Sequence, residues 1–238
     1  MLVIKKSTIV ISVALILTAI TFIICVTGIT SLQANKSSAK SYTIVLDAGH
    51  GGIDQGASGV KTGVTESQIN LKIVKNLENY LLSSGFNVVL TRNSENGLYG
   101  VATSNRKKKD MQKRKEIIEK AKPSLVVSVH LNTYTLSTRR GPQVFFKKGD
   151  NLSKSLADNV QTCLNGLNED VKDYSAITGD YFILNCSSAP SVICECGFLS
   201  NPKDEELLIT EKYQKEVAYA IYNGIVSYFS VNSFKFTD

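Results

Sequence analysis

Four polar residues of the chain could together hold and use a metal ion: His50, Glu66, His130 and Glu195. The two histidines are the only ones among 238 residues. Two imidazoles and one carboxylate around an open fourth position are a typical catalytic zinc set, whereas structural zinc sites are usually closed by thiolates. Zinc lowers the pKa of bound water to about 7, and a second carboxylate can take up the released proton. The residue types therefore predict a zinc hydrolase, and they leave open which glutamate is the ligand and which the base.

Each of these residues also has an ordinary structural explanation. Most histidines are surface or core residues, and Glu66 could serve as a first-turn acid that the helix dipole favours. Glu195 is harder to explain in this way, because it stands between Cys194 and Cys196 in an apolar segment. A charge buried there is costly without a partner or a function.

The elements expected along the chain alternate between strands and helices. Short apolar runs predict strands at Tyr42–Asp47, Asn87–Thr91, Leu125–His130, Gly141–Phe146, Tyr181–Leu184 and Ser191–Glu195. Apolar residues at helical spacing predict helices from Thr65 to Gly85, near Asp110–Ala121, at Ser153–Leu167 and near Glu211–Phe229. This order predicts an α/β domain of three layers, with a mostly parallel central sheet covered by helices on both faces.

The predicted sheet brings the four polar residues to one edge. His50 follows the first strand, and His130 and Glu195 each end another. Glu66 opens the first long helix, so its side chain can reach back over the same edge. Ligands of such sheets bind outside the carboxyl ends of the strands, which is where we expect the metal site.

The first 30 residues predict an export signal or an N-terminal membrane anchor. Lys5 and Lys6 precede an apolar stretch from Ile9 to Ile29. A helix of about 21 residues spans roughly 31 Å, close to the thickness of a membrane's hydrocarbon core. We expect a small, polar linker at residues 31–41, a catalytic domain at 42–230 and a short C-terminal tail at 231–238. The protein is therefore expected outside the cytoplasm, secreted or anchored.

The charge balance argues against a dedicated nucleic-acid binder. The chain has 27 Lys and Arg against 21 Asp and Glu, a net charge of +6, well short of the dense positive surface that nucleic acid requires. The densest basic cluster, Arg106–Lys115, is expected on a helix. We interpret it as a solvated face, with contact to an acidic wall polymer or a membrane surface as the alternative.

The cysteines predict free thiols rather than disulfide bonds. Cys163, Cys186, Cys194 and Cys196 could in principle form two bridges, and Cys25 lies in the apolar leader. A domain of this size can bury a sufficient core without them.

Several segments resemble the zinc-dependent N-acetylmuramoyl-L-alanine amidases of bacterial cell walls. They are IVLDAGHGGIDQGASG, TESQIN, the LTR at Leu90 to Arg92, SVHLN at Ser128 to Asn132, and ECGFLSNPKDE from Glu195. They occur in family order from about Thr43 to Phe229. The resemblance implies that zinc is held by His50, Glu66 and His130 and that Glu195 is the general base. It also implies cleavage of the amide between N-acetylmuramic acid and L-alanine in peptidoglycan.

Four further residues lie near these motifs and are candidates for substrate binding: Asn70, Arg92, Arg114 and Asn132. Support of the ligands or plain structural hydrogen bonding are the alternatives. The segment from Asn93 to Lys113 departs from the family, because it is rich in asparagine and then in lysine where relatives carry acidic residues and a leucine.

The bare architecture, without an added wall-binding repeat, looks most like the germination-specific amidases of spore formers. That likeness implies removal of stem peptides from spore-cortex peptidoglycan, before muramic-δ-lactam is formed. The alternatives are a vegetative autolysin for cell separation and a catalytically idle wall-binding protein. Because nothing in the chain supplies wall targeting, an exported activating protein is a further hypothesis.

Overall fold

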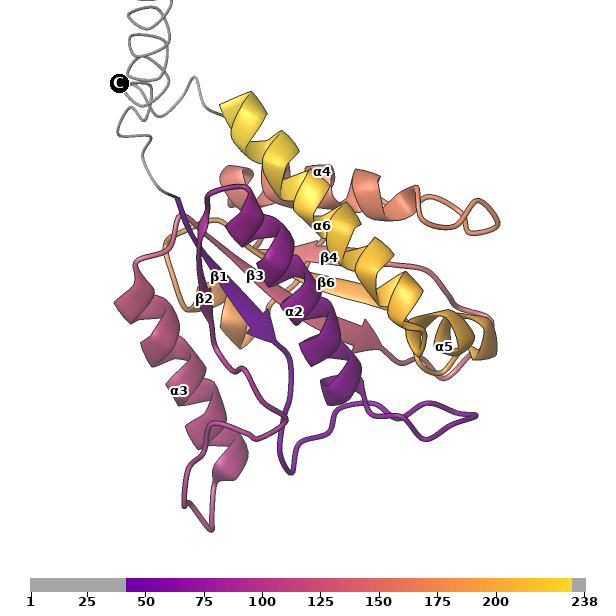
Figure 1. The fold of residues 1–238 in the computed structure, drawn as a ribbon, viewed down its shortest axis with the longest axis horizontal. Coiled ribbons are helices and arrows are strands. Elements are labelled where there is room, and N and C mark those ends of the chain that lie inside the picture. The colour runs from indigo at the N-terminus through magenta and orange to yellow at the C-terminus, as the bar shows by residue number, and fades with distance from the viewer. Residues whose placement is uncertain (1–41, 233–238) are drawn as a thin grey trace, which may run out of the picture. The chain divides into compact units, whose positions relative to one another are not determined.

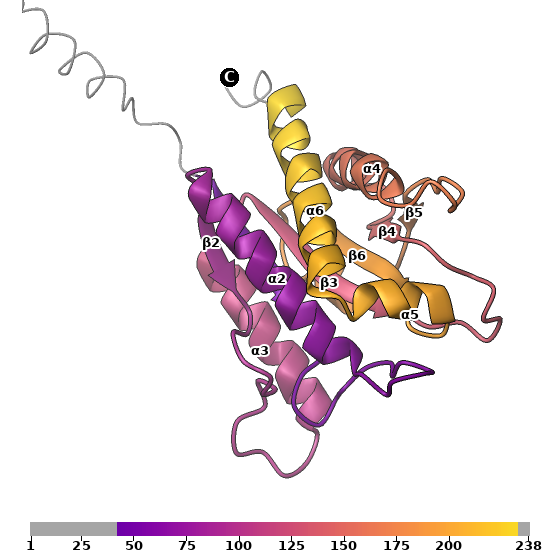
Figure 2. The same cartoon turned by 45° about the vertical axis from the view of Figure 1, so that its right-hand side comes forward.

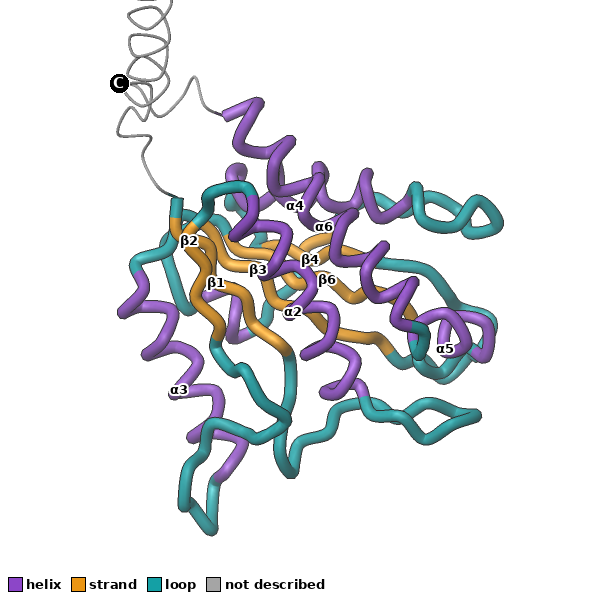
Figure 3. The backbone as a smooth tube through the Cα atoms, in the orientation of Figure 1, coloured by secondary structure: helices purple, strands orange, loops and turns teal. Residues whose placement is uncertain are grey.

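The protein is described here by a computed structural model, which places residues 42–232 (Figure 1). Its strands are β1 (Thr43–Ala48), β2 (Asn87–Leu90), β3 (Leu125–Asn132), β4 (Gln143–Phe146), β5 (Ile177–Thr178) and β6 (Ser191–Phe198). Its helices are α2 (Glu66–Ser83), α3 (Arg106–Ala121), α4 (Asn151–Asn165), the 3-10 helix η1 (Phe182–Asn185), α5 (Pro202–Leu208) and α6 (Glu211–Asn232). Figure 3 shows the strands together at the centre, with helices around them.

The strands form one sheet in the order β2-β1-β3-β6-β4-β5. β1 pairs in parallel with β2 and β3, and β3 pairs in parallel with β6. β4 is antiparallel to β6, and the short β5 is parallel to β4. The predicted, mostly parallel sheet is therefore confirmed.

Helices cover both faces of the sheet, as predicted. On one face α2, α4 and α6 pack side by side (Figures 1 and 2), and their apolar residues join Leu46, Val127 and Val192 in the larger core. On the other face Ile118 of α3 and Ile183 of η1 pack with Val45 of β1 in a smaller core. Alternating residues of β1 thus face opposite layers, which is why Ile44, Val45 and Leu46 are all apolar.

The strand predicted at Tyr181–Leu184 is wrong. Phe182–Asn185 form a 3-10 helix, in which the neighbours Ile183 and Leu184 are both buried against the same small core. A short apolar run does not distinguish a strand from a buried helical turn by periodicity alone. The short elements α5 and β5 were not predicted from the sequence.

Several other predictions concern residues 1–41 and 233–238. The apolar leader, the linker, Cys25 and most of the C-terminal tail lie outside the described residues. Within residues 42–232 no helix is both long and apolar enough to cross a membrane. The four cysteines of this part are free, and Cys186, Cys194 and Cys196 are buried, as expected.

A buried ionic cluster holds the carboxyl ends of the strands together. Asp47, which is 2% exposed at the end of β1, accepts hydrogen bonds of 2.6 Å from the hydroxyls of Thr91 and Ser128. It also pairs with Arg114 of α3, which is equally buried and donates to Asp110. The cluster joins the ends of β1 and β2, the middle of β3, and α3.

This cluster predicts a loss of stability in acid. Burial alone would raise the pKa of Asp47, but Arg114 and the hydroxyls of Ser128 and Thr91 lower it to about 2. Because the folded-state pKa lies below the unfolded value, Asp47 contributes its full stabilisation above the unfolded pKa. This contribution, about 2 kcal/mol, is lost as the pH falls from about 5 to about 2.

Asp47→Asn should lower the free energy of unfolding at pH 7 by about 3 kcal/mol, because Arg114 loses one buried anionic partner. It should also reduce the pH dependence in acid, as measured by urea unfolding between pH 3 and 7. The matched control is Asp173→Asn at an exposed position. A wild-type pH dependence in Asp47→Asn would contradict the assignment.

Candidate active site

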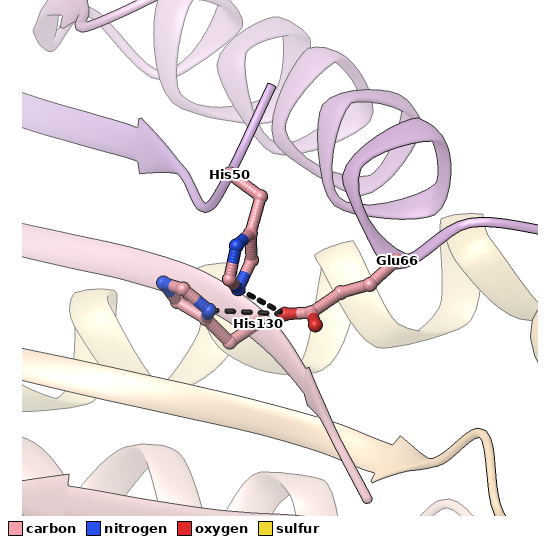
Figure 4. Close-up of side chains that lie close together, drawn as sticks. All are labelled: His50, Glu66 and His130. Carbon is pink, nitrogen blue, oxygen red and sulfur yellow. Dashed lines mark hydrogen bonds and ion pairs between the residues drawn. The ribbon is translucent and has the colours of Figure 1, made fainter. Parts of the chain in front are cut away.

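Three of the predicted residues converge at the carboxyl edge of the sheet (Figure 4). His50 comes from the loop after β1, His130 from β3, and Glu66 from the first turn of α2. Glu66 Oε1 lies 3.3 Å from His50 Nε2 and 3.0 Å from His130 Nδ1. One ligand atom from each residue lies within 4.8 Å of the others.

The donor set fits a zinc ion. With metal–ligand distances near 2.0–2.2 Å, the corners of a tetrahedral zinc site are about 3.3 Å apart, similar to the separations of Glu66 Oε1 from the two imidazole nitrogens. The two histidine side chains are each about one-fifth exposed, so the cluster faces solvent on one side. That side leaves room for the open position that a catalytic site needs.

The partners of Glu66 keep it ionised despite its burial. Burial would raise the pKa of Glu66, but hydrogen bonds with His130 and His50 and the charges of these imidazoles lower it well below its usual value. Its Oε1 also accepts hydrogen bonds from Leu131 N and Asn70 Nδ2, and Oε2 accepts one from Ala57 N. Glu66 therefore presents a fixed carboxylate to the two imidazoles.

Glu195 lies beside this cluster in a different electrostatic state. In the β3–β6 ladder it is the direct partner of His130. Burial raises the pKa of Glu195 to about 7, and its Oε2 is buried without a hydrogen-bond partner among the described residues. A carboxylate that can both take and release a proton near neutral pH is suited to general acid–base catalysis.

The loop that carries His50 has an unusual backbone. His50 has φ 61°, a left-handed conformation that is uncommon for residues other than glycine. At Gly49, an added Cβ would lie 2.2 Å from Cε1 of His130, so only glycine lets the two imidazoles approach. Gly49 N also donates to Val129 O, which ties the loop to β3.

Two buried arginines support this loop. Arg92 is 3% exposed and donates to the carbonyls of Ala48, Gly49 and Ser67, at 2.8, 2.9 and 2.8 Å. Arg114 is 2% exposed and donates to the carbonyls of Ala48 and His50. Because both side chains are buried and bonded to the backbone, support of the loop is favoured over contact with substrate.

The two asparagines differ in their surroundings. Asn70 is fully buried and bridges Gly49 O and Glu66 Oε1, so it also supports the loop and the carboxylate of Glu66. Asn132 ends β3 where its register with β6 shifts, and its Oδ1 accepts a hydrogen bond from Thr133 N. It is half-buried, and its contact with substrate stays a prediction.

Sequence reasoning missed Asp54. Its Oδ1 lies 2.9 Å from His50 Nδ1, so it orients the imidazole with Nε2 toward Glu66. A metal-ligating histidine usually has such a partner on its other nitrogen. Gly51 and Asp54 exchange backbone hydrogen bonds, which folds Asp54 back over His50. The GGID segment is a turn signal that could have indicated this approach.

A cavity of about 370 Å³ opens onto these groups. His50, His130 and Glu195 line it together with residues from α3 and η1. The wall from η1 and β6 is apolar and includes Tyr181, Phe182, Ile183 and Ile193. The wall from α3 includes Lys107, Asp110, Met111 and Arg114.

Comparisons with known proteins show the family of the chain. The sequence profile of the N-acetylmuramoyl-L-alanine amidase family matches residues 44–227. The germination-specific N-acetylmuramoyl-L-alanine amidase of Bacillus subtilis (strain 168) is 34% identical over 194 residues, covering 79% of each chain.

Solved structures give the same result. The CwlD amidase of Clostridioides difficile, in complex with the GerS lipoprotein, has a TM-score of 0.77 and 39% identity, covering 80% of this chain and all of that one. The N-acetylmuramoyl-L-alanine amidase of Clostridium difficile 630 has a TM-score of 0.71 and 29% identity, covering 81% and 98%. Sequence and fold therefore agree along the whole described domain, and the chain belongs to the N-acetylmuramoyl-L-alanine amidase family, whose enzymes hydrolyse an amide bond of peptidoglycan.

Proposed function

We propose that His50, Glu66 and His130 hold a catalytic zinc ion and that Glu195 is the general base of this amidase. The observation that carries the proposal is the cluster of two imidazoles around one ionised, buried carboxylate. When bound, zinc polarises the scissile carbonyl and lowers the pKa of a water molecule.

The protein's own groups perform the remaining steps. Glu195 accepts a proton from the attacking water and delivers it to the amine of L-alanine as the amide C–N bond breaks. Its raised pKa suits both transfers near neutral pH. Asp54 holds the tautomer of His50, and Arg92 and Arg114 fix the backbone that carries it.

Glu195→Gln should lower kcat for release of L-alanine-linked peptides from purified muropeptides by about 10²- to 10⁴-fold, because glutamine cannot accept the proton. Zinc content and thermal stability should stay at wild-type levels. The control is Glu206→Gln, an exposed carboxylate on α5. A Glu195→Gln variant with wild-type kcat would disprove the mechanism.

The ligand assignment predicts about one zinc ion per chain. His50→Ala or His130→Ala should abolish tight binding, because the chain has no third histidine. Asp54→Asn should weaken zinc affinity by about 10- to 100-fold, as measured by competition with a chelator, because His50 loses its orienting partner. Asp158→Asn, at the exposed ion pair with Lys154, is the control. Unchanged zinc binding in both histidine variants would refute the site.

We further propose that residues 42–230 form the catalytic domain of an exported enzyme, with residues 1–30 as the export signal or anchor and 31–41 as the linker. The charge pattern and apolar length of the leader support this assignment. The wall location of the substrate agrees with it.

We also propose that the substrate is spore-cortex peptidoglycan. Support comes from the similarity to the germination-specific amidase of Bacillus subtilis and to the CwlD amidase. The CwlD structure contains the GerS lipoprotein, and by analogy we propose that an exported protein assists this amidase too.

Deletion of the gene should remove muramic-δ-lactam from cortex muropeptides, because the lactam forms only where the stem peptide has been cleaved off. Muropeptide analysis of purified spores would measure this, with the wild-type gene restored as the positive control and Glu195→Gln as the negative one. Unchanged lactam together with chained vegetative cells would instead assign the enzyme to cell separation.

A further inference from the structure

The α3 wall of the catalytic cavity carries one exposed cation. Lys107 lines the cavity, its side chain is 75% exposed, and its Nζ lies 3.5 Å from Asp54 Oδ2. The other cation of the lining, Arg114, is 2% exposed and donates to Asp47, Asp110 and two backbone carbonyls. Among the lining residues, Lys107 is therefore the cation that can meet a substrate.

Folding alone does not explain the charge at this position. The first turn of α3 has the sequence Arg106–Lys109 and contains no acidic residue. Cations at the amino end of a helix are opposed by the helix dipole, and Asn105 provides no side-chain cap. The basic cluster is predicted to be a solvated face, and Lys108 and Lys109 are exposed as that prediction requires, whereas Lys107 lines the cavity.

The wall formed by η1, Tyr181 and Ile193 carries no cation. Phe182, which is 48% exposed, and Ile193 and Ile183 present apolar surface. The carboxylates of Glu195 and Asp54 also line the cavity, and when charged they would repel a second carboxylate unless a cation lay beside it. Lys107 is in contact with Asp54 and can take that position.

We propose that Lys107 binds the α-carboxylate of the second stem residue and makes the enzyme select stems in which this group is not amidated. In peptidoglycan stems, L-alanine is followed by a γ-linked D-glutamate whose α-carboxyl group is either free or amidated. The inference rests on the proposed function, because it requires the scissile amide to lie beside Glu195 and the histidine cluster.

Lys107 lies beside the histidine cluster, on the far side of Asp54. Its Nζ is 3.5 Å from Asp54 Oδ2, and Asp54 Oδ1 is 2.9 Å from His50 Nδ1. Two extended residues span at most about 7 Å, which is the reach of a substrate from the scissile carbonyl to that carboxylate. The lysine side chain is long and exposed, so its ammonium group can shift toward a bound carboxylate and away from Asp54.

The test uses two muramyl dipeptides that differ in one group: N-acetylmuramoyl-L-alanyl-D-isoglutamate, with a free carboxylate, and the corresponding D-isoglutamine, with an amide. Full-length wild type, Lys107→Gln and Lys107→Arg are compared, with Lys109→Gln as the matched control on the same helical turn. KM and kcat are measured for both substrates. Binding of the two released dipeptides, measured by calorimetry, gives a readout that needs no turnover.

The KM for the free acid should be about threefold to tenfold lower than the KM for the amide. This preference is expected in wild type, Lys109→Gln and Lys107→Arg. Lys107→Gln should lose that preference, with kcat nearly unchanged and the amide substrate unaffected. Equal KM values for the two substrates in wild type, or an unchanged preference in Lys107→Gln, would overturn the inference. If the released dipeptides show the preference but neither substrate is cleaved, the proposed function fails and the recognition by Lys107 stands.

Discussion

The buried carboxylate of Glu66 is the constraint on which the site depends. It is 3% exposed and makes contact with His50, His130, Leu131 N and Ala57 N. A buried carboxylate is costly unless its oxygens are satisfied, and these partners come from the first loop and from β3 as well as from α2. A shift of one of these segments would take partners away from the buried charge, so Glu66 helps to fix their relative positions as well as those of the two imidazoles.

This constraint explains why α2 begins at Glu66. The amides of Glu66 and Ser67 donate to carbonyls of the preceding loop, at Ala57 and Gln55. Thr65 and Gln68 form a capping box around the same turn. The helix dipole also favours an acid at this position. Glu66 can therefore serve as a first-turn acid and as the proposed metal ligand in the same arrangement.

Sequence reasoning could predict which residues meet, because strand ends in a parallel sheet share an edge. His50, Glu66 and His130 follow from that rule, and Glu195 was marked by its position between two buried cysteines. It could not predict Asp54, because the approach to His50 depends on a turn at Gly51–Asp54.

Contacts that depend on helix packing could not be predicted from the sequence either. Arg114 reaches the carbonyl of His50 from 64 residues away, and only the packing of α3 against the sheet sets that distance. The same limit applies to η1. The run Tyr181–Leu184 is as apolar as a strand, and what decides its form is the small core beneath Ile183 and Leu184.

Burial separates the groups that hold the site together from the exposed side chains of the cavity. Glu66, Arg92 and Arg114 are almost fully buried and each has several partners, so the fold and the chemistry depend on the same contacts. Lys107 and Phe182 line the same cavity but are largely exposed. Exposed side chains with few partners can change at little cost in stability. Substitution of Lys107 should therefore change the cavity wall at little cost to the fold and to the histidine and glutamate cluster.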